Sequence, residues 1–153
     1  SMYALNIKSD GNERVIANIM NSTVGKDRWF AFNMPYPCRM SYAAWGGNVM
    51  DRYSDLEEDV SPYSTNCGIW SDRWEWNKRE KNDLMISKMP SSNSTGKVRH
   101  YYVSPDLHLG ADVKKWAIGD ESYLHAHWRM VKDDSHFVGI CTDFYEEARE
   151  FFK

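Results

Sequence analysis

The sequence predicts an α+β fold: a single domain with a largely antiparallel β-sheet and a C-terminal α-helix packed on it. Two pairs of alternating apolar runs, each pair joined by residues typical of turns, predict antiparallel hairpins. Aromatic residues make up 14% of the chain, which favours strands. An aromatic stripe at helical spacing near the C-terminus predicts the covering helix. The 153 residues can bury a core without disulfide bonds, and we expect about six to nine strands.

The first expected element is a hairpin made of residues 3–7 and 15–19. Apolar residues alternate with polar ones in both runs, and Asp10-Gly11 lies between them. An Asp-Gly pair between two alternating runs is a strong hairpin signal. Ser1, which precedes Met2, resembles a residue left after removal of an expression tag.

Short strands are expected next, over residues 28–32 and 39–44. Pro35 and Pro37 end the first strand because proline lacks a backbone donor. Gly46-Gly47 closes the second strand. Residues 51–59 carry five acidic side chains against a single arginine, which predicts a short exposed helix or an ordered loop.

The central region, residues 69–89, admits two interpretations. Alternation of its tryptophans favours a hairpin that ends before Pro90, whereas spacing of three and four residues would also fit a helix. The polar residues 90–97 are expected to form a mobile loop. A strand over 99–103 follows.

The second predicted hairpin lies near the C-terminus. Over residues 123–131 the even-numbered positions are apolar, 132–135 is rich in turn-forming residues, and 136–141 is a second strand-forming run.

A helix is expected after this hairpin. Asp143, with Thr142 as the alternative, is placed to cap it, and Glu146 would complete a capping box. Phe144, Ala148 and Phe151 recur at helical spacing and are expected to pack on the sheet.

His127-Trp128-Arg129, the charged turn, Val138-Gly139-Ile140 and the Glu-rich aromatic helix together resemble the end of EVH1 and other pleckstrin-like domains. The resemblance covers about a fifth of the chain and implies a sheet capped by a C-terminal helix. The N-terminal run has no tryptophan where that family keeps part of its proline-binding triad, and residues 35–100 have no counterpart.

Composition narrows the function classes. The net charge of −3 argues against a dedicated nucleic-acid binder, which needs a basic face. Three cysteines, Cys38, Cys67 and Cys141, form no metal-type pair and fit free thiols in a reducing compartment. No apolar run is long enough to span a membrane, and the first residues do not form a signal peptide. A cytoplasmic protein without a cofactor is expected.

The sharpest candidate for chemistry is His125-Ala126-His127. On a strand, both imidazoles would project from one face and could share a metal ion. His108 or His100 could supply a third ligand, which would indicate a metal-dependent hydrolase. Because the pattern is short and no nearby carboxylate completes it, we expect surface histidines and no bound metal.

Other catalytic patterns are incomplete. The sequence has no Gly-x-Ser-x-Gly elbow and no phosphate-binding glycine loop. Cys141 lies in an apolar run, and no base can be assigned to Cys67. We therefore expect no enzymatic activity.

Exposed aromatic side chains and the acidic segment are the expected binding elements, since tryptophan often anchors interfaces. The candidate binding residues are Trp70, Trp74, Trp76, Trp45, Asp55, Glu57 and Glu58. The leading hypothesis is a protein-binding domain that regulates or inhibits another protein. The alternative is a small-ligand or glycan-binding domain in which Trp70, Trp74 and Trp76 form a stacking platform.

Overall fold

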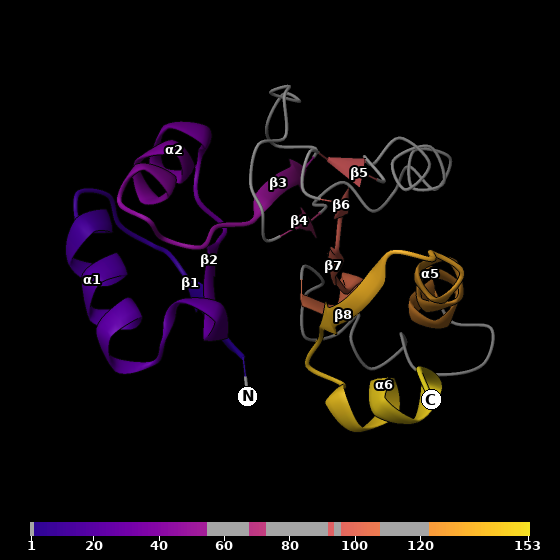
Figure 1. Cartoon of the computed structure of the whole chain (residues 1–153). Coiled ribbons are helices and arrows are strands. Elements are labelled where there is room, and N and C mark those ends of the chain that lie inside the picture. The colour runs from indigo at the N-terminus through magenta and orange to yellow at the C-terminus, as the bar shows by residue number, and fades with distance from the viewer. Residues whose placement is uncertain (1, 55–67, 73–91, 94–95, 108–122) are drawn as a thin grey trace.

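The computed structural model describes residues 2–54, 68–72, 92–93, 96–107 and 123–153 (Figure 1). In chain order the elements are β1 (Tyr3–Asn6), α1 (Glu13–Thr23), the 3-10 turn Lys26–Arg28, β2 (Trp29–Phe32), α2 (Tyr36–Ala44), β3 (Asp51–Ser54), β4 (Ile69–Asp72), β5 (Ser92–Asn93), β6 (Gly96–Lys97), β7 (His100–Val103), the 3-10 turn Pro105–Leu107, α5 (Tyr123–Lys132), β8 (Phe137–Cys141) and α6 (Tyr145–Phe151).

The main strands are parallel and follow chain order in space. β1 pairs with β2, and a second sheet has the order β3-β4-β7-β8. The segment before β3 connects them, because the Ala31 amide donates to Asn48 and the Met50 amide donates to Ala31. Among the described strands, β1 and β8 therefore form the two outer edges.

The predicted antiparallel sheet is wrong. Among the described strands only β5 and β6, two residues each, pair in the antiparallel sense. Parallel neighbours need a crossover, and α1 supplies it between β1 and β2, as α5 does between β7 and β8. Both predicted hairpins are therefore wrong, because a helix takes the place of one strand in each of them.

The expected N-terminal hairpin fails at its second half, which is helix α1. Ile16 and Met20 lie one turn apart and pack, together with Leu5 and Ile7, against the buried cluster that includes Trp29. The alternation of apolar and polar residues over 15–19 does not reflect a strand, because these residues belong to helix α1. Gly11 adopts a φ of 86°, which opens the loop between β1 and α1 rather than a tight hairpin turn.

Residues 39–44, expected as a strand, belong to helix α2. Pro35 stands at its N-cap and Pro37 lies in its first turn, where a missing amide hydrogen costs nothing. Cys38 and Tyr42 are one turn apart and join the core beside β2. The prolines end β2, as predicted, but they also start a helix.

The first strand of the C-terminal hairpin is helix α5. Leu124, Trp128 and Val131 recur at helical spacing and are almost completely buried. Leu124 and Trp128 also fit an alternating pattern, which is why the sequence favoured a strand. Without that strand, the resemblance to the end of pleckstrin-like domains does not hold.

The strand and helix predicted for the end of the chain are confirmed as β8 and α6. Phe144, Ala148 and Phe151 pack with Trp128 of α5 and Ile140 of β8. No side chain makes the expected capping box; instead Phe144 is at the N-cap, and its amide donates to the Thr142 hydroxyl at 3.1 Å.

The predictions for the middle of the chain met mixed outcomes. The strands expected at 28–32 and 99–103 are confirmed as β2 and β7. Residues 51–54 form the buried strand β3 instead of an exposed helix or loop. Residues 69–72 form β4, whereas the rest of the 69–89 hairpin lies outside the described residues, and part of 90–97 pairs as β5 and β6.

Truncation of Phe151 to alanine tests the docking of α6. The Phe151 ring lies 5.4 Å from that of Trp128 and 5.2 Å from that of His125. Loss of the ring should lower the free energy of unfolding by about 3 kcal/mol in urea titrations. Tyr145→Ala, at an exposed position of the same helix, should change it by less than about 0.5 kcal/mol. Equal effects would mean that α6 is not docked as described.

Candidate functional site

An apolar groove runs between β1 and α1. Its volume is about 380 Å³, and it is lined by Ala4, Leu5, Asn6, Ile7, Ile16, Ile19 and Met20. Ile19 is 53% exposed, so the groove is open to solvent at this residue.

The outer edge of β1 borders this groove. No described residue pairs with that edge, because β1 has β2 as its neighbour on the other side. The Ile7 amide donates to the Phe32 carbonyl at 3.2 Å. Since successive amides of a strand point in opposite directions, the amides of Ala4 and Asn6 point outward. An unpaired strand edge beside an apolar groove is a template for a further strand.

Further apolar side chains are exposed in this part of the chain. Met2 and Tyr3 lie at the start of β1, and Val15 lies on the outer side of α1. Trp45, predicted as a binding residue, is 50% exposed at the end of α2, and the Arg14 guanidinium lies 5.3 Å from its ring centre. Trp45 is thus available on the surface of the N-terminal unit (β1, α1, β2 and α2).

The structure assigns the other predicted tryptophan it describes to the core. Trp70 is 6% exposed and stacks on Phe32 with 3.9 Å between ring centres. It offers no open face for a sugar, so the predicted platform lacks one of its three members. Trp74, Trp76, Asp55, Glu57, Glu58 and His108 lie outside the described residues.

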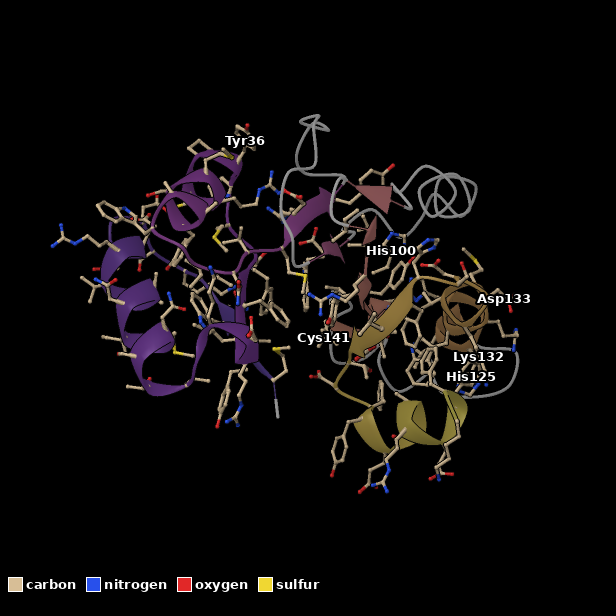
Figure 2. All side chains as sticks on the ribbon, in the orientation of Figure 1. Tyr36, His100, His125, Lys132, Asp133 and Cys141 are labelled. Carbon is tan, nitrogen blue, oxygen red and sulfur yellow. The ribbon has the colours of Figure 1, made fainter. Side chains whose placement is uncertain are left out.

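His125 and His127 occupy helix α5 instead of a strand. Two positions on a helix are about 200° apart, so the two side chains leave from different sides. The His125 ring lies among the rings of Trp128 and Phe151, beside α6 (Figure 2). His127 is buried. Because the strand geometry is wrong, the two-residue spacing no longer supports a shared metal ion.

A buried polar cluster that the sequence did not predict surrounds Asp134. Its Oδ2 lies 2.6 Å from His100 Nδ1 and accepts a 2.6 Å hydrogen bond from the Tyr102 hydroxyl. Its Oδ1 accepts from the His136 amide at 2.9 Å. Burial alone would raise the pKa of Asp134, but hydrogen bonds from Tyr102, His136 and His100 lower it below its ordinary value.

This Asp134 cluster joins the start of β7 to the turn before β8. His100, Asp134 and His136 have a donor set that a metal could use, and their ligand atoms lie within 4.8 Å of one another. Both carboxylate oxygens, however, already accept hydrogen bonds. His100 lies well away from His125, so the cluster does not extend the predicted histidine pair (Figure 2). The hydrogen bonds of Asp134 therefore indicate a structural role, in which it holds β7 to the turn before β8.

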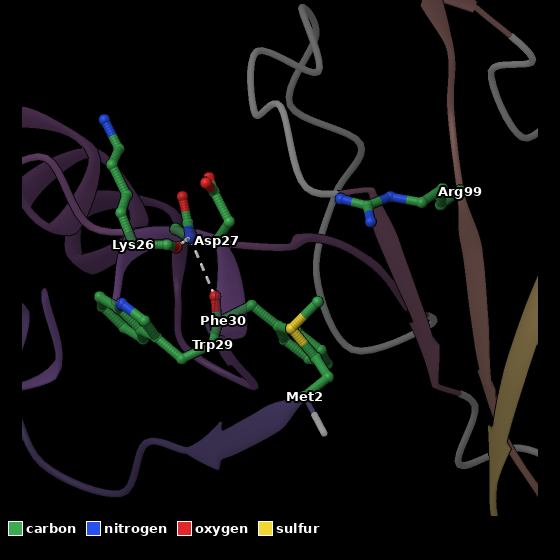
Figure 3. Close-up of a pocket in the computed structure, with 7 residues that line it drawn as sticks. Met2, Lys26, Asp27, Trp29, Phe30 and Arg99 are labelled. Carbon is green, nitrogen blue, oxygen red and sulfur yellow. Dashed lines mark hydrogen bonds between the residues drawn. The ribbon is translucent and has the colours of Figure 1, made fainter. Parts of the chain in front are cut away.

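A second hollow of about 330 Å³ lies between the two sheets (Figure 3). Lys26 and Arg99 lie on opposite sides of it, and both are exposed, as is Asp27. The Asn48 side-chain amide is already used, since it donates to the carbonyls of Lys26 and Trp29. The residues that line this hollow therefore present mixed charges on solvated side chains, in contrast to the apolar groove.

Comparison with family models, curated proteins and solved structures found no match to this chain. No helix among the described residues is long and apolar enough to cross a membrane.

Proposed function

We propose that this protein binds another protein by accepting an extended segment at the outer edge of β1, with apolar side chains of that segment entering the groove beside α1. The observation that carries the proposal is the combination of an unpaired strand edge with an apolar groove directly beside it. In strand addition, main-chain hydrogen bonds supply affinity, and pockets for alternate side chains supply specificity.

The two features complement each other in geometry. The outward amides of Ala4 and Asn6 offer donors at every second residue, which is the spacing that an added strand requires. Leu5 and Ile7, from the alternate positions, line the groove together with Ile16 and Met20. An extended segment on the edge would therefore place every second side chain against apolar surface.

The charge of the N-terminal unit favours an acidic partner segment. Residues 1–50 hold five Lys or Arg and three Asp or Glu, so this part is net positive although the whole chain is at −3. Complementary charge speeds association and selects the partner. The expected partner thus carries an apolar extended segment flanked by acidic residues.

β8, the other outer strand, is a weaker candidate. It exposes Val138, which is 49% accessible, but the two hollows described above do not include any of its residues. β1 has both the edge and the groove.

Exposed Tyr3 and Trp45 would extend the contact as aromatic anchors. The acidic residues 55–59 lie outside the described residues, and a second contact through them remains a prediction. We place this role in the cytoplasm, where Cys38 and Cys141, both free thiols, would stay reduced. Sequestering a segment of the partner would make the protein a regulator or inhibitor.

A pull-down from native extract with two matched variants tests the proposal. Ile19 lines the groove and Val15 does not, yet both are exposed aliphatic residues on α1. Burial of an isoleucine contributes about 1.5–3 kcal/mol. Ile19→Glu should therefore weaken retention of the partner about tenfold or more, whereas Val15→Glu should retain it at the wild-type level.

Equal retention by the two variants would contradict binding at the groove. Sedimentation of the purified protein tests whether the edge of β1 is instead occupied by a second copy of this chain. A dimer that Ile19→Glu dissociates and Val15→Glu preserves would assign the edge to self-association and overturn the proposal.

A further inference from the structure

Three side chains with metal-ligand chemistry meet where β1 and β2 end. Asp10 lies in the loop after β1, Glu13 is the first residue of α1, and Cys38 lies in the first turn of α2. The carboxyl ends of parallel strands are where open α/β sheets bind ligands. The three ligand atoms lie within 4.8 Å of one another.

The Cys38 thiol lies within hydrogen-bond distance of two carboxylates. Its sulfur lies 2.9 Å from Asp10 Oδ1 and 3.1 Å from Glu13 Oε1. A thiol has a single hydrogen to donate, so it can satisfy only one of the two carboxylates at a time. The Gly11 amide donates to the same Glu13 oxygen at 3.0 Å. The thiol hydrogen can thus serve only one of the two carboxylates, and a cation bound to the thiolate and to both carboxylates would remove that shortfall.

Tyr42 provides an independent indication of a ligand. It follows Cys38 by one helical turn, so the two side chains leave the same face of α2. Its side chain is fully buried, and its hydroxyl has no hydrogen-bond partner in the described part of the chain. A buried hydroxyl without a partner destabilises the folded state, so a bound species that it contacts would be stabilising.

We propose that Asp10, Glu13 and Cys38 form a zinc site, with the fourth position taken by a water molecule that the Tyr42 hydroxyl contacts. One thiolate and two carboxylates suit a tetrahedral zinc ion, which accepts both sulfur and oxygen ligands. Hard cations such as Mg²⁺ prefer oxygen ligands alone, so the sulfur selects against them. Binding releases the Cys38 proton to solvent and leaves a Zn²⁺–thiolate bond.

Zinc binding would be a function separate from the proposed protein binding. Its expected effect is on the structure near the groove. A zinc ion would tie the start of α1 to the start of α2 through the loop that contains Gly11. Because α1 forms one wall of the groove, the ion would hold that wall in place. The groove and the zinc site share no lining residue, so each can fail without the other.

The test uses the full chain, stripped of metal, titrated with Zn²⁺ and separately with Co²⁺. One equivalent of Zn²⁺ should bind by calorimetry, and Co²⁺ should give the near-ultraviolet charge-transfer band of a thiolate ligand. Cys38→Ser should abolish the band and weaken zinc binding about 100-fold or more, while Asp10→Asn should weaken it about tenfold or more. Cys67→Ser and Cys141→Ser, which keep the proposed ligands, should leave both signals unchanged.

Two results would overturn the site. The first is the absence of stoichiometric Zn²⁺ binding by the wild-type chain. The second is a charge-transfer band that survives Cys38→Ser, since the sulfur would then come from another cysteine. Asp10 is exposed, so Asp10→Asn should keep the fold even if Cys38→Ser does not, as circular dichroism would show. Unweakened zinc binding by Asp10→Asn would also exclude the proposed ligand set.

Discussion

Replacing Asp134 by alanine should lower the free energy of unfolding by about 3–5 kcal/mol at neutral pH. The substitution removes the acceptor for the Tyr102 hydroxyl and for His100 Nδ1, both of which are almost completely buried. A buried polar group that loses its partner retains the full cost of its desolvation. Urea titration gives the measurement, with the transition midpoint read against an unchanged slope.

Asp133→Ala is the matched control, because Asp133 is the preceding residue and is exposed. Its effect should stay within about 0.5 kcal/mol. If the two alanine variants unfold at the same urea concentration, the Asp134 cluster does not hold β7 to the turn before β8.

The effect of Asp134 should also depend on pH. Its folded-state pKa lies below the ordinary value, so its contribution is fully present above the unfolded-state pKa of about 3.9 and is lost as pH falls through the folded-state value. The difference in unfolding free energy between wild type and Asp134→Ala should therefore be constant near neutrality and shrink below about pH 4. A difference that grows on acidification would contradict a charged Asp134 in the folded protein.

Trp128→Ala should cost about 3–5 kcal/mol, the range for removal of a large aromatic side chain from a core. The Trp128 side chain is fully buried, and its ring packs at 5.4 Å and 5.8 Å from those of Phe151 and Phe152. Its indole nitrogen donates to the Ser104 hydroxyl at 2.9 Å, and the truncation leaves that buried hydroxyl without its donor. Calorimetric melting of the purified variants measures the loss.

Trp45→Ala provides the comparison for an indole on the surface. Its ring is half-exposed and has Arg14 as a cation–π neighbour, so its loss should cost less than about 1 kcal/mol. Comparable losses for Trp45 and Trp128 would mean that the assignment of one to the surface and one to the core is wrong.

Local signals in the sequence predicted some elements well. The run 136–141 has few polar residues and became β8, and the stripe through Phe144, Ala148 and Phe151 became the packed face of α6. These elements were predictable because each shows one period only. Leu124 and Trp128 are different, since a spacing of four residues satisfies both an alternating strand and a helix.

Strand direction could not be read from the same patterns. An Asp-Gly pair such as Asp10-Gly11 is typical of hairpins, but the helix that follows it separates β1 from β2 and makes them parallel. A parallel pairing depends on where the chain returns after a crossover. That is a property of packing between segments far apart in the sequence, and no local run records it.

The candidate sites were hidden for the same reason. His100 and Asp134 are 34 residues apart, and Asp10 and Cys38 are 28 apart. Neither pair has the short spacing of a metal or catalytic motif, so only the return of the chain to the same sheet edge brings them together. The alternation over residues 15–19 predicts a strand, which would place Ile19 on a sheet, so the sequence does not predict the groove beside β1.

Amide hydrogen exchange along β1, followed by NMR, tests the proposed binding edge most directly. In the free protein, the amides of Leu5 and Ile7, which face β2, should be protected, whereas those of Ala4 and Asn6 should exchange rapidly. Addition of the partner recovered by the wild-type chain should slow exchange at Ala4 and Asn6 and leave Leu5 and Ile7 as they were. Protection that appears elsewhere, with Ala4 and Asn6 still exchanging rapidly in the complex, would contradict strand addition at β1.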